Sequence, residues 1–199
     1  MWMLAVLMGC AGGTSLDEDD DDGGGLIFPG DSGEDGSVVE IETSMGILVV
    51  SLDEDAAPVT VDNFLSYVDD GFYDGTDGEG ATVFHRVIGG FMAQGGGVTE
   101  GGGKKATASA IVLESDNGLS NQAGTIAMAR TDNPDSATSQ FFINLVDNNF
   151  LDYADASNPG YAVFGELIEG DDVLAAIGAV PTSGEQPTTD VVITRCERR

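Results

Sequence analysis

The alternation of apolar and polar residues divides the chain into short strands and two helices. Short runs rich in Val, Ile, Thr and Phe and bounded by Gly, Asp or Ser predict strands. Such runs cover residues 38–43, 46–52, 81–88, 124–129, 141–145, 162–169 and 191–196. The first two runs are joined at residues 44–46, which predicts a hairpin. Residues 95–103 are too rich in glycine to predict a regular element.

Two segments have the period of a helix instead. Pro58 suits the first position of a helix, and four apolar residues follow it at the spacing i, i+3, i+4, i+7 between Val61 and Val68. This helix should bury one stripe and end near Gly71, and residues 171–177 predict a second, short helix. Many short strands with only two helices indicate a mainly β, α+β fold. A closed barrel is attractive because it leaves no exposed sheet edge.

The first 37 residues differ in composition from the rest. Residues 1–9 are uncharged and apolar, too short to span a bilayer as a helix, and resemble the end of a secretory signal. Leu7-Met8-Gly9-Cys10 resembles a bacterial lipobox, which predicts lipidation at Cys10; an ordinary cleaved signal and a chance apolar start are the alternatives. Residues 10–37, rich in Gly, Asp and Ser, predict a flexible acidic tether. Residues 38–199 then form the folded domain.

Cys196 is the only other cysteine. A disulfide between Cys10 and Cys196 would be usual for an exported protein with two cysteines. Lipidation of Cys10 disfavours that bridge. Cys196 is then interpreted as a small buried residue on the last strand.

The net charge of −28 excludes several classes of partner. Nine acidic residues lie in 11–35, which leaves 26 acids against seven bases in the rest of the chain. This balance repels nucleic acid and anionic membrane surfaces, so we expect membrane contact only through the lipid anchor. A solvated acidic surface is the simplest interpretation. Calcium capture by the Asp17–Asp22 run is the alternative, but the run lacks the spacing of an EF-hand, so no metal site is predicted.

One arginine in an apolar strand stands out in this acidic chain. Arg86 lies within FHRVIGGFMAQGGG (84–97), and a guanidinium that is always charged is costly to bury alone. A surface ion pair is one explanation, and a place in a functional site is the other. His85, the single histidine, invites acid–base chemistry, but a structural role is the simpler interpretation. The glycine run 95–97 lacks the Lys-Ser/Thr that follows in a phosphate-binding loop.

Four blocks together resemble the cyclophilin-type peptidyl-prolyl cis/trans isomerases. They are FHRVIGGFMAQGGG (84–97), GTIAMAR (124–130), SATSQFFINLVDNNFLD (136–152) and YAVFGELIEGDDVLAAI (161–177), and the resemblance covers about residues 38–197. SDNGL (115–119) and SATSQFFIN resemble the periplasmic bacterial branch. The resemblance implies an eight-stranded antiparallel β-barrel capped by two helices, with a substrate groove on its outer face. It implies isomerisation of X–Pro bonds in exported or envelope proteins; the alternative is a non-catalytic Pro-peptide binding module or chaperone tethered at the membrane.

The same resemblance assigns roles to individual residues. The catalytic arginine corresponds to Arg86, with Gln94 beside it. Matching positions give the catalytic set Arg86, Gln94, Phe91 and Phe142. They give the substrate-binding set His85, Met92, Ala129, Arg130, Gln140, Phe150, Leu151 and Tyr161. Phe150 and Tyr161 stand where many eukaryotic members have tryptophan and histidine, which argues against tight cyclosporin binding.

The implied chemistry suits these residues. The barrier of roughly 18–20 kcal/mol comes from amide resonance, and no bond is broken, so we expect no cofactor and no metal. A donor aimed at the prolyl nitrogen and an apolar pocket for the ring are sufficient. The expected partners are proline-containing polypeptides. We expect a monomer on the periplasmic side of the cell envelope, and Ala11-Gly12 after Cys10 favours the outer membrane.

Overall fold

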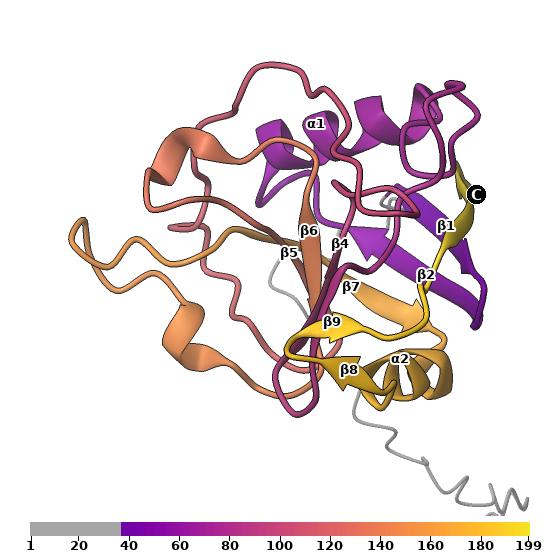
Figure 1. Cartoon of the computed structure of the whole chain (residues 1–199). Helices are drawn as coiled ribbons and strands as arrows, with labels where there is room; N and C mark the ends of the chain where they lie inside the picture. Colours follow the sequence, from indigo (N-terminus) through magenta and orange to yellow (C-terminus); the bar gives the residue numbers. More distant parts are fainter. Residues whose placement is uncertain (1–36) are drawn as a thin grey trace, which may run out of the picture. The chain divides into compact units, whose positions relative to one another are not determined.

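The computed structural model describes residues 37–199 (Figure 1). Cys10, the predicted signal segment and most of the predicted tether lie outside the described residues. The strands are β1 (Val38–Thr43), β2 (Gly46–Leu52), β3 (Arg86–Ile88), β4 (Met92–Gly95), β5 (Thr125–Met128), β6 (Phe141–Asn144), β7 (Val163–Glu169), β8 (Thr182–Ser183), β9 (Gln186–Pro187) and β10 (Ile193–Arg198). The helices are α1 (Pro58–Asp69) and α2 (Asp171–Gly178), with two 3-10 turns, Pro134–Ser136 and Asn149–Leu151.

Eight strands form one antiparallel sheet in the order β10-β1-β2-β7-β5-β6-β4-β3. The sheet curls until the segments preceding its two end strands meet. The backbone N–H of Phe84 donates to the carbonyl of Val191, and the N–H of Ile193 donates to the carbonyl of Thr82, both at 2.9 Å. An isolated bridge pairs residues 83 and 192 at this point. The predicted mainly β fold of eight strands and two helices is confirmed, with one short bridge joining the ends of the sheet.

The two helices lie at opposite ends of the curled sheet (Figure 1). Pro58 begins α1 as predicted, and the predicted apolar stripe is buried. Ala57 provides no side-chain cap, so a distant carboxylate replaces it. Glu114 accepts hydrogen bonds from the backbone N–H groups of Val59 and Thr60 at 3.1 and 2.7 Å. Within residues 37–199, neither helix has the length and apolarity needed to cross a bilayer.

Three details of the strand prediction are wrong. The predicted strand 81–88 pairs regularly only at Arg86–Ile88, because its first residues form isolated bridges instead. Residues 92–95 form β4, which a four-residue run followed by glycines does not reveal by periodicity. The hairpin of β8 and β9, with two residues in each strand, is shorter still and was not predicted.

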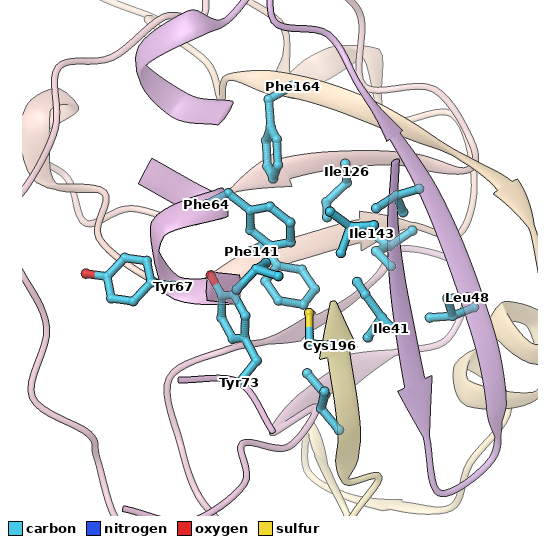
Figure 2. Close-up of a cluster of buried hydrophobic side chains, with 14 of the residues drawn as sticks. Ile41, Leu48, Phe64, Tyr67, Tyr73, Ile126, Phe141, Ile143, Phe164 and Cys196 are labelled. Carbon is cyan, nitrogen blue, oxygen red and sulfur yellow. The ribbon is translucent and has the colours of Figure 1, made fainter. Parts of the chain in front are cut away.

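The interior of the curled sheet holds the main core, and Figure 2 displays part of its buried side chains. Phe141 lies at its centre, with Phe64 edge-on at 5.6 Å and Phe84 edge-on at 5.9 Å between ring centroids. Edge-to-face pairs of this kind are favourable beyond the area that they bury. The prediction that Phe84, Phe141 and Phe164 are core residues is confirmed. Cys196 is also buried on β10 as predicted, and burial raises the pKa of its thiol.

Candidate active site

A row of four side chains crosses the outer face of the sheet. Arg86 on β3 pairs with Gln94 on β4, Gln94 pairs with Phe142 on β6, and Phe142 pairs with Ala127 on β5. Directly paired residues of antiparallel strands project from the same face. The register therefore brings together the arginine, the glutamine and one aromatic residue that are separated by up to 56 positions in the sequence.

The neighbouring row, one residue along each strand, faces the other way. Val87, Ala93, Ile143 and Ile126 are paired in the same order, and all four belong to the interior core. Because side chains alternate between faces, each of these strands serves the core and the groove at once. A shift of one residue in register would exchange the two sets.

The outer row borders a pocket with a volume of about 110 Å³. This is small beside the roughly 300–1,000 Å³ of pockets for drug-sized ligands, and it suits one small ring. Nine residues line it, and the sequence predicted every one of them: Arg86, Phe91, Met92, Gln94, Ala129, Arg130, Phe142, Leu151 and Tyr161.

The floor of the pocket is apolar. Met92, Ala127, Phe142 and Val163 form a second buried cluster outside the barrel, and partly buried side chains around them complete it. The ring of Tyr161 meets Phe142 edge-on, with centroids 5.6 Å apart and an interplanar angle of 82°. Apolar contact on the floor and sides provides a surface against which a saturated ring can be buried.

Arg86 occupies the polar rim. Its Nε donates to Oε2 of Glu185 at 2.6 Å, and its Nη1 lies 3.5 Å from Oε1 of Gln94. The Arg86 side chain is 39% exposed and that of Glu185 is 54% exposed. The hydrogen bond from Arg86 lowers the pKa of Glu185. Both explanations suggested by the sequence therefore apply, since Arg86 makes an ion pair and also lines the pocket.

Gln94 continues the polar rim away from Arg86. Its Nε2 donates to Oε1 of Gln140 at 2.9 Å, so Gln140 lies beside the pocket and holds the amide that borders it. His85 is half-buried and is not among the pocket-lining residues. Burial lowers the pKa of His85, and its buried Nδ1 has no hydrogen-bond partner among the described residues. A neutral imidazole at this position agrees with a structural role.

The guanidinium of Arg130 makes its hydrogen bonds within the protein. Its Nε and Nη2 donate to the carbonyl of Gly160 at 2.9 and 2.7 Å, and its Nη1 donates to the carbonyl of Thr131 at 2.8 Å. The guanidinium also stacks over the ring of Tyr161, 4.6 Å from its centroid. Arg130 therefore fixes the wall that Tyr161 forms, and its planar face stabilises that ring.

Phe91 lines the pocket and stacks on Phe150, which lies next to it. Their rings stack with centroids 5.7 Å apart and an interplanar angle of 21°. Phe150 is 69% exposed, so it extends the apolar surface beyond the pocket into solvent. Leu151 lines the pocket, and the next residue, Asp152, is part of the network that holds this wall.

A polar network behind the pocket was not predicted. Asn148 donates from Nδ2 to the carbonyl of Phe91 at 2.9 Å and to Oδ1 of Asn144 at 2.8 Å. Asp152 accepts from the backbone N–H and Nδ2 of Asn121 at 2.7 and 2.9 Å. Burial raises the pKa of Asp152, but these bonds and others outweigh it, so the pKa lies below its usual value. The clusters of Asn and Asp in the family-like blocks were the only sequence signal for this network.

Glu185 is the other residue that sequence reasoning missed. It lies 99 positions from Arg86, in a hairpin too short to predict. No local pattern connects a glutamate in a Gly-Glu turn with an arginine on a distant strand. Only the folded register brings them together.

Comparison with known proteins assigns the chain to a family. The family model described as cyclophilin type peptidyl-prolyl cis-trans isomerase/CLD matches residues 38–198. A peptidyl-prolyl cis-trans isomerase of Acinetobacter baylyi is 52% identical over 147 residues, covering 74% of each chain. Peptidyl-prolyl cis-trans isomerase B of Escherichia coli is 48% identical over 163 residues, covering 78% of this chain and 96% of its own.

A solved structure agrees with these relatives. The Cryptosporidium parvum cyclophilin type peptidyl-prolyl cis-trans isomerase, crystallised in the presence of the dipeptide Ala-Pro, has a TM-score of 0.66 and 26% identity. The similarity covers 81% of this chain and 98% of that one. The family model spans residues 38–198 and so includes every strand that borders the pocket. The chain belongs to the cyclophilin-type peptidyl-prolyl cis-trans isomerase family.

Proposed function

We infer that this chain is a peptidyl-prolyl cis-trans isomerase that binds the proline ring in the outer pocket and acts through Arg86. One observation carries the assignment of the site. Arg86 and Gln94 lie side by side at the rim of a small pocket with an apolar floor, on paired positions of adjacent strands. The family and its named relatives support the activity, and the solved relative crystallised with Ala-Pro supports proline-containing peptides as substrates.

The reaction requires rotation about one amide bond. Resonance in that bond gives the barrier of roughly 18–20 kcal/mol, and it is lost as the amide twists. A hydrogen bond to the prolyl nitrogen favours the twisted, pyramidal form, because its lone pair is then localised. Arg86 remains charged at physiological pH and has five N–H donors, so it can supply this bond while Glu185 and Gln94 occupy other donors.

The pocket contributes by holding the ring as a pivot. Phe142 and Met92 form its floor, and Phe91, Leu151 and Tyr161 form its sides. The bound ring stays fixed while the residue before proline turns with its carbonyl. Preorganised groups at the rim then stabilise the transition state without reorganising, which is the usual source of the largest rate effects.

The activity is tested by a protease-coupled isomerisation assay on a proline-containing peptide. Arg86→Ala should reduce kcat/KM by about 10²–10³-fold, the range for loss of one preorganised donor. Asp69→Ala is the matched control. It removes a similarly exposed ion pair on another part of the domain, in which the Asp69 carboxylate lies 2.6 Å from the Arg198 guanidinium. Equal activity of wild type and Arg86→Ala would overturn the catalytic assignment. A wild type that binds the peptide without turnover would favour the non-catalytic binding module.

We further propose that the domain acts on exported or envelope proteins from the periplasmic side of the cell envelope. Support comes from the sequence: Leu7-Met8-Gly9-Cys10 resembles a lipobox, and residues 10–37 have the composition of a tether. Cys10 would carry the lipid, and the domain would work as a monomer at the end of the tether. Mass spectrometry of the membrane fraction tests this, since a soluble protein with unmodified Cys10 would contradict it.

A further inference from the structure

The short hairpin of β8 and β9 is closed by a well-defined two-residue turn. Residues 182 and 183 pair with residues 187 and 186, so Gly184 and Glu185 are the two turn residues. Gly184 has φ = +67°, which glycine adopts without strain and which a two-residue hairpin turn requires. Thr188 closes the hairpin, because its N–H and hydroxyl donate to the carbonyl of Pro181 at 2.9 and 3.1 Å.

This turn is docked on the strand that carries Arg86. The backbone N–H of Val87 donates to the carbonyl of Glu185 at 2.7 Å. The main chain of Glu185 is therefore fixed next to the residue that follows the arginine. From that position its carboxylate reaches back to Nε of Arg86 at 2.6 Å.

Arg86 is thus held on two sides. Glu185 engages Nε, and Gln94 approaches Nη1 at 3.5 Å. Among the described residues, these are the hydrogen bonds of the guanidinium, so its remaining N–H donors are available to a ligand in the pocket.

We propose that Glu185 is a positioning residue for the isomerase reaction, which orients the guanidinium of Arg86 toward the pocket; this rests on the catalytic role proposed for Arg86. An ion pair with side chains 39% and 54% exposed adds little to stability. A free arginine side chain, however, has many rotamers to lose on reaching the transition state. The pair with Glu185 removes much of that freedom beforehand.

The carboxylate also has an opposing effect, because its negative charge reduces the field of the guanidinium at the substrate. Solvent around the half-exposed carboxylate screens that effect, since charges in a high dielectric interact weakly. Orientation is a matter of geometry and is not screened. The structure therefore favours a net gain in rate from Glu185.

The test compares the wild type with five variants, and it measures kcat, KM and peptide affinity for each of the six proteins. Glu185→Ala should lower kcat roughly fivefold with KM nearly unchanged, well below the ~10²-fold that a 1 Å misplacement can cause. Glu185→Gln keeps an oxygen that can accept the hydrogen bond from Nε of Arg86. This variant should therefore retain most of the wild-type kcat. In an Arg86→Ala background, measured by NMR exchange on the same peptide, Glu185→Ala should have no further effect. Asp69→Ala should match the wild type.

Each other outcome has a distinct meaning. An unchanged or raised kcat in Glu185→Ala would overturn the proposal, as would a changed KM at constant kcat. An equal loss in the Arg86→Ala background would also overturn it, because Glu185 would then act independently of Arg86. Failure of the proposed function is separate, since it appears as wild-type activity in the Arg86→Ala single variant or as a wild type without turnover.

Discussion

The inner and outer faces of β4 and β6 are built from alternate residues of the same strands, but they are packed differently. On the inner face, Phe141 and Ile143 have no exposed surface, and Phe141 lies among aromatic rings (Figure 2). On the outer face, Phe142 and Met92 are also buried, but a hollow of about 110 Å³ lies over them. The inner face is filled by the protein itself, and the outer face leaves space for one ring.

This difference separates stability from activity within a few residues of sequence. A filled interior loses contacts whenever a side chain is shortened, because the surrounding structure relaxes only partly. The outer cluster is smaller and borders solvent, so it can tolerate a vacancy more easily. Neighbouring residues such as Phe141 and Phe142 should therefore differ in which measurement responds to their loss.

The largest effect should come from Phe141→Ala. Removal of this ring from the centre of the core should lower the free energy of unfolding by about 3–5 kcal/mol. Urea denaturation measures this change, and kcat/KM at low temperature should stay within about twofold of wild type for the folded protein. A large loss of activity without loss of stability would contradict the claim that the inner face governs stability and the outer face governs activity.

Phe142→Ala should show the opposite balance. Its stability loss should be about 2 kcal/mol, smaller than that of Phe141→Ala because the ring borders a hollow. Its kcat/KM should fall by about tenfold or more, since a tenfold change needs only about 1.4 kcal/mol of lost transition-state stabilisation. Isomerisation assays on both variants in parallel check the comparison. It would be contradicted if Phe142→Ala kept full activity.

Asp152→Asn tests the network behind the pocket. Loss of the charged acceptor should cost about 1–2 kcal/mol near neutral pH. The pKa of Asp152 in the folded state is lowered from 3.8, so its contribution is present above that value and is lost as pH falls through the lowered pKa. Urea midpoints of wild type and variant should thus converge in strong acid. A gap that stays constant with pH would contradict the role of the carboxylate.

The smallest effect should come from Phe150→Ala beside the pocket. With 69% of the residue exposed, the free energy of unfolding should change by no more than about 0.5 kcal/mol. KM should rise by about twofold because the outer apolar contact with the peptide is reduced. Thermal denaturation and steady-state kinetics provide the two measurements. A change in kcat alone would place Phe150 closer to the reacting bond than its position suggests.

The pocket was predictable from the sequence because most of its residues come from short contiguous blocks. Arg86, Phe91 and Gln94 lie within one hairpin, and Phe142 and Leu151 lie within another family-like block. The order and spacing of these blocks resemble one family, and that resemblance alone predicts that their side chains share one groove. The pattern of apolar and polar residues predicted most of the longer strands to within a few residues.

The long-range polar contacts were not predictable. Glu114 caps α1 from 54 positions away, and Glu185 pairs with Arg86 from 99 positions away. The sequence around a surface glutamate in an acidic chain does not reveal its partner, because a carboxylate is as stable in solvent as in a surface ion pair. Strands of two to four residues, such as β4 and β8, likewise fall below the length at which alternation can be recognised.

The pairing of β1 with β10 has a consequence for biosynthesis. These neighbours in the sheet are joined by contacts such as Arg195 with Glu40, 155 positions apart. During translation one edge of β1 stays without its partner until β10 has left the ribosome, and such distant pairings slow folding. An exposed strand edge can pair with other chains in that interval. The nascent domain should therefore be most prone to aggregate just before its last strand emerges.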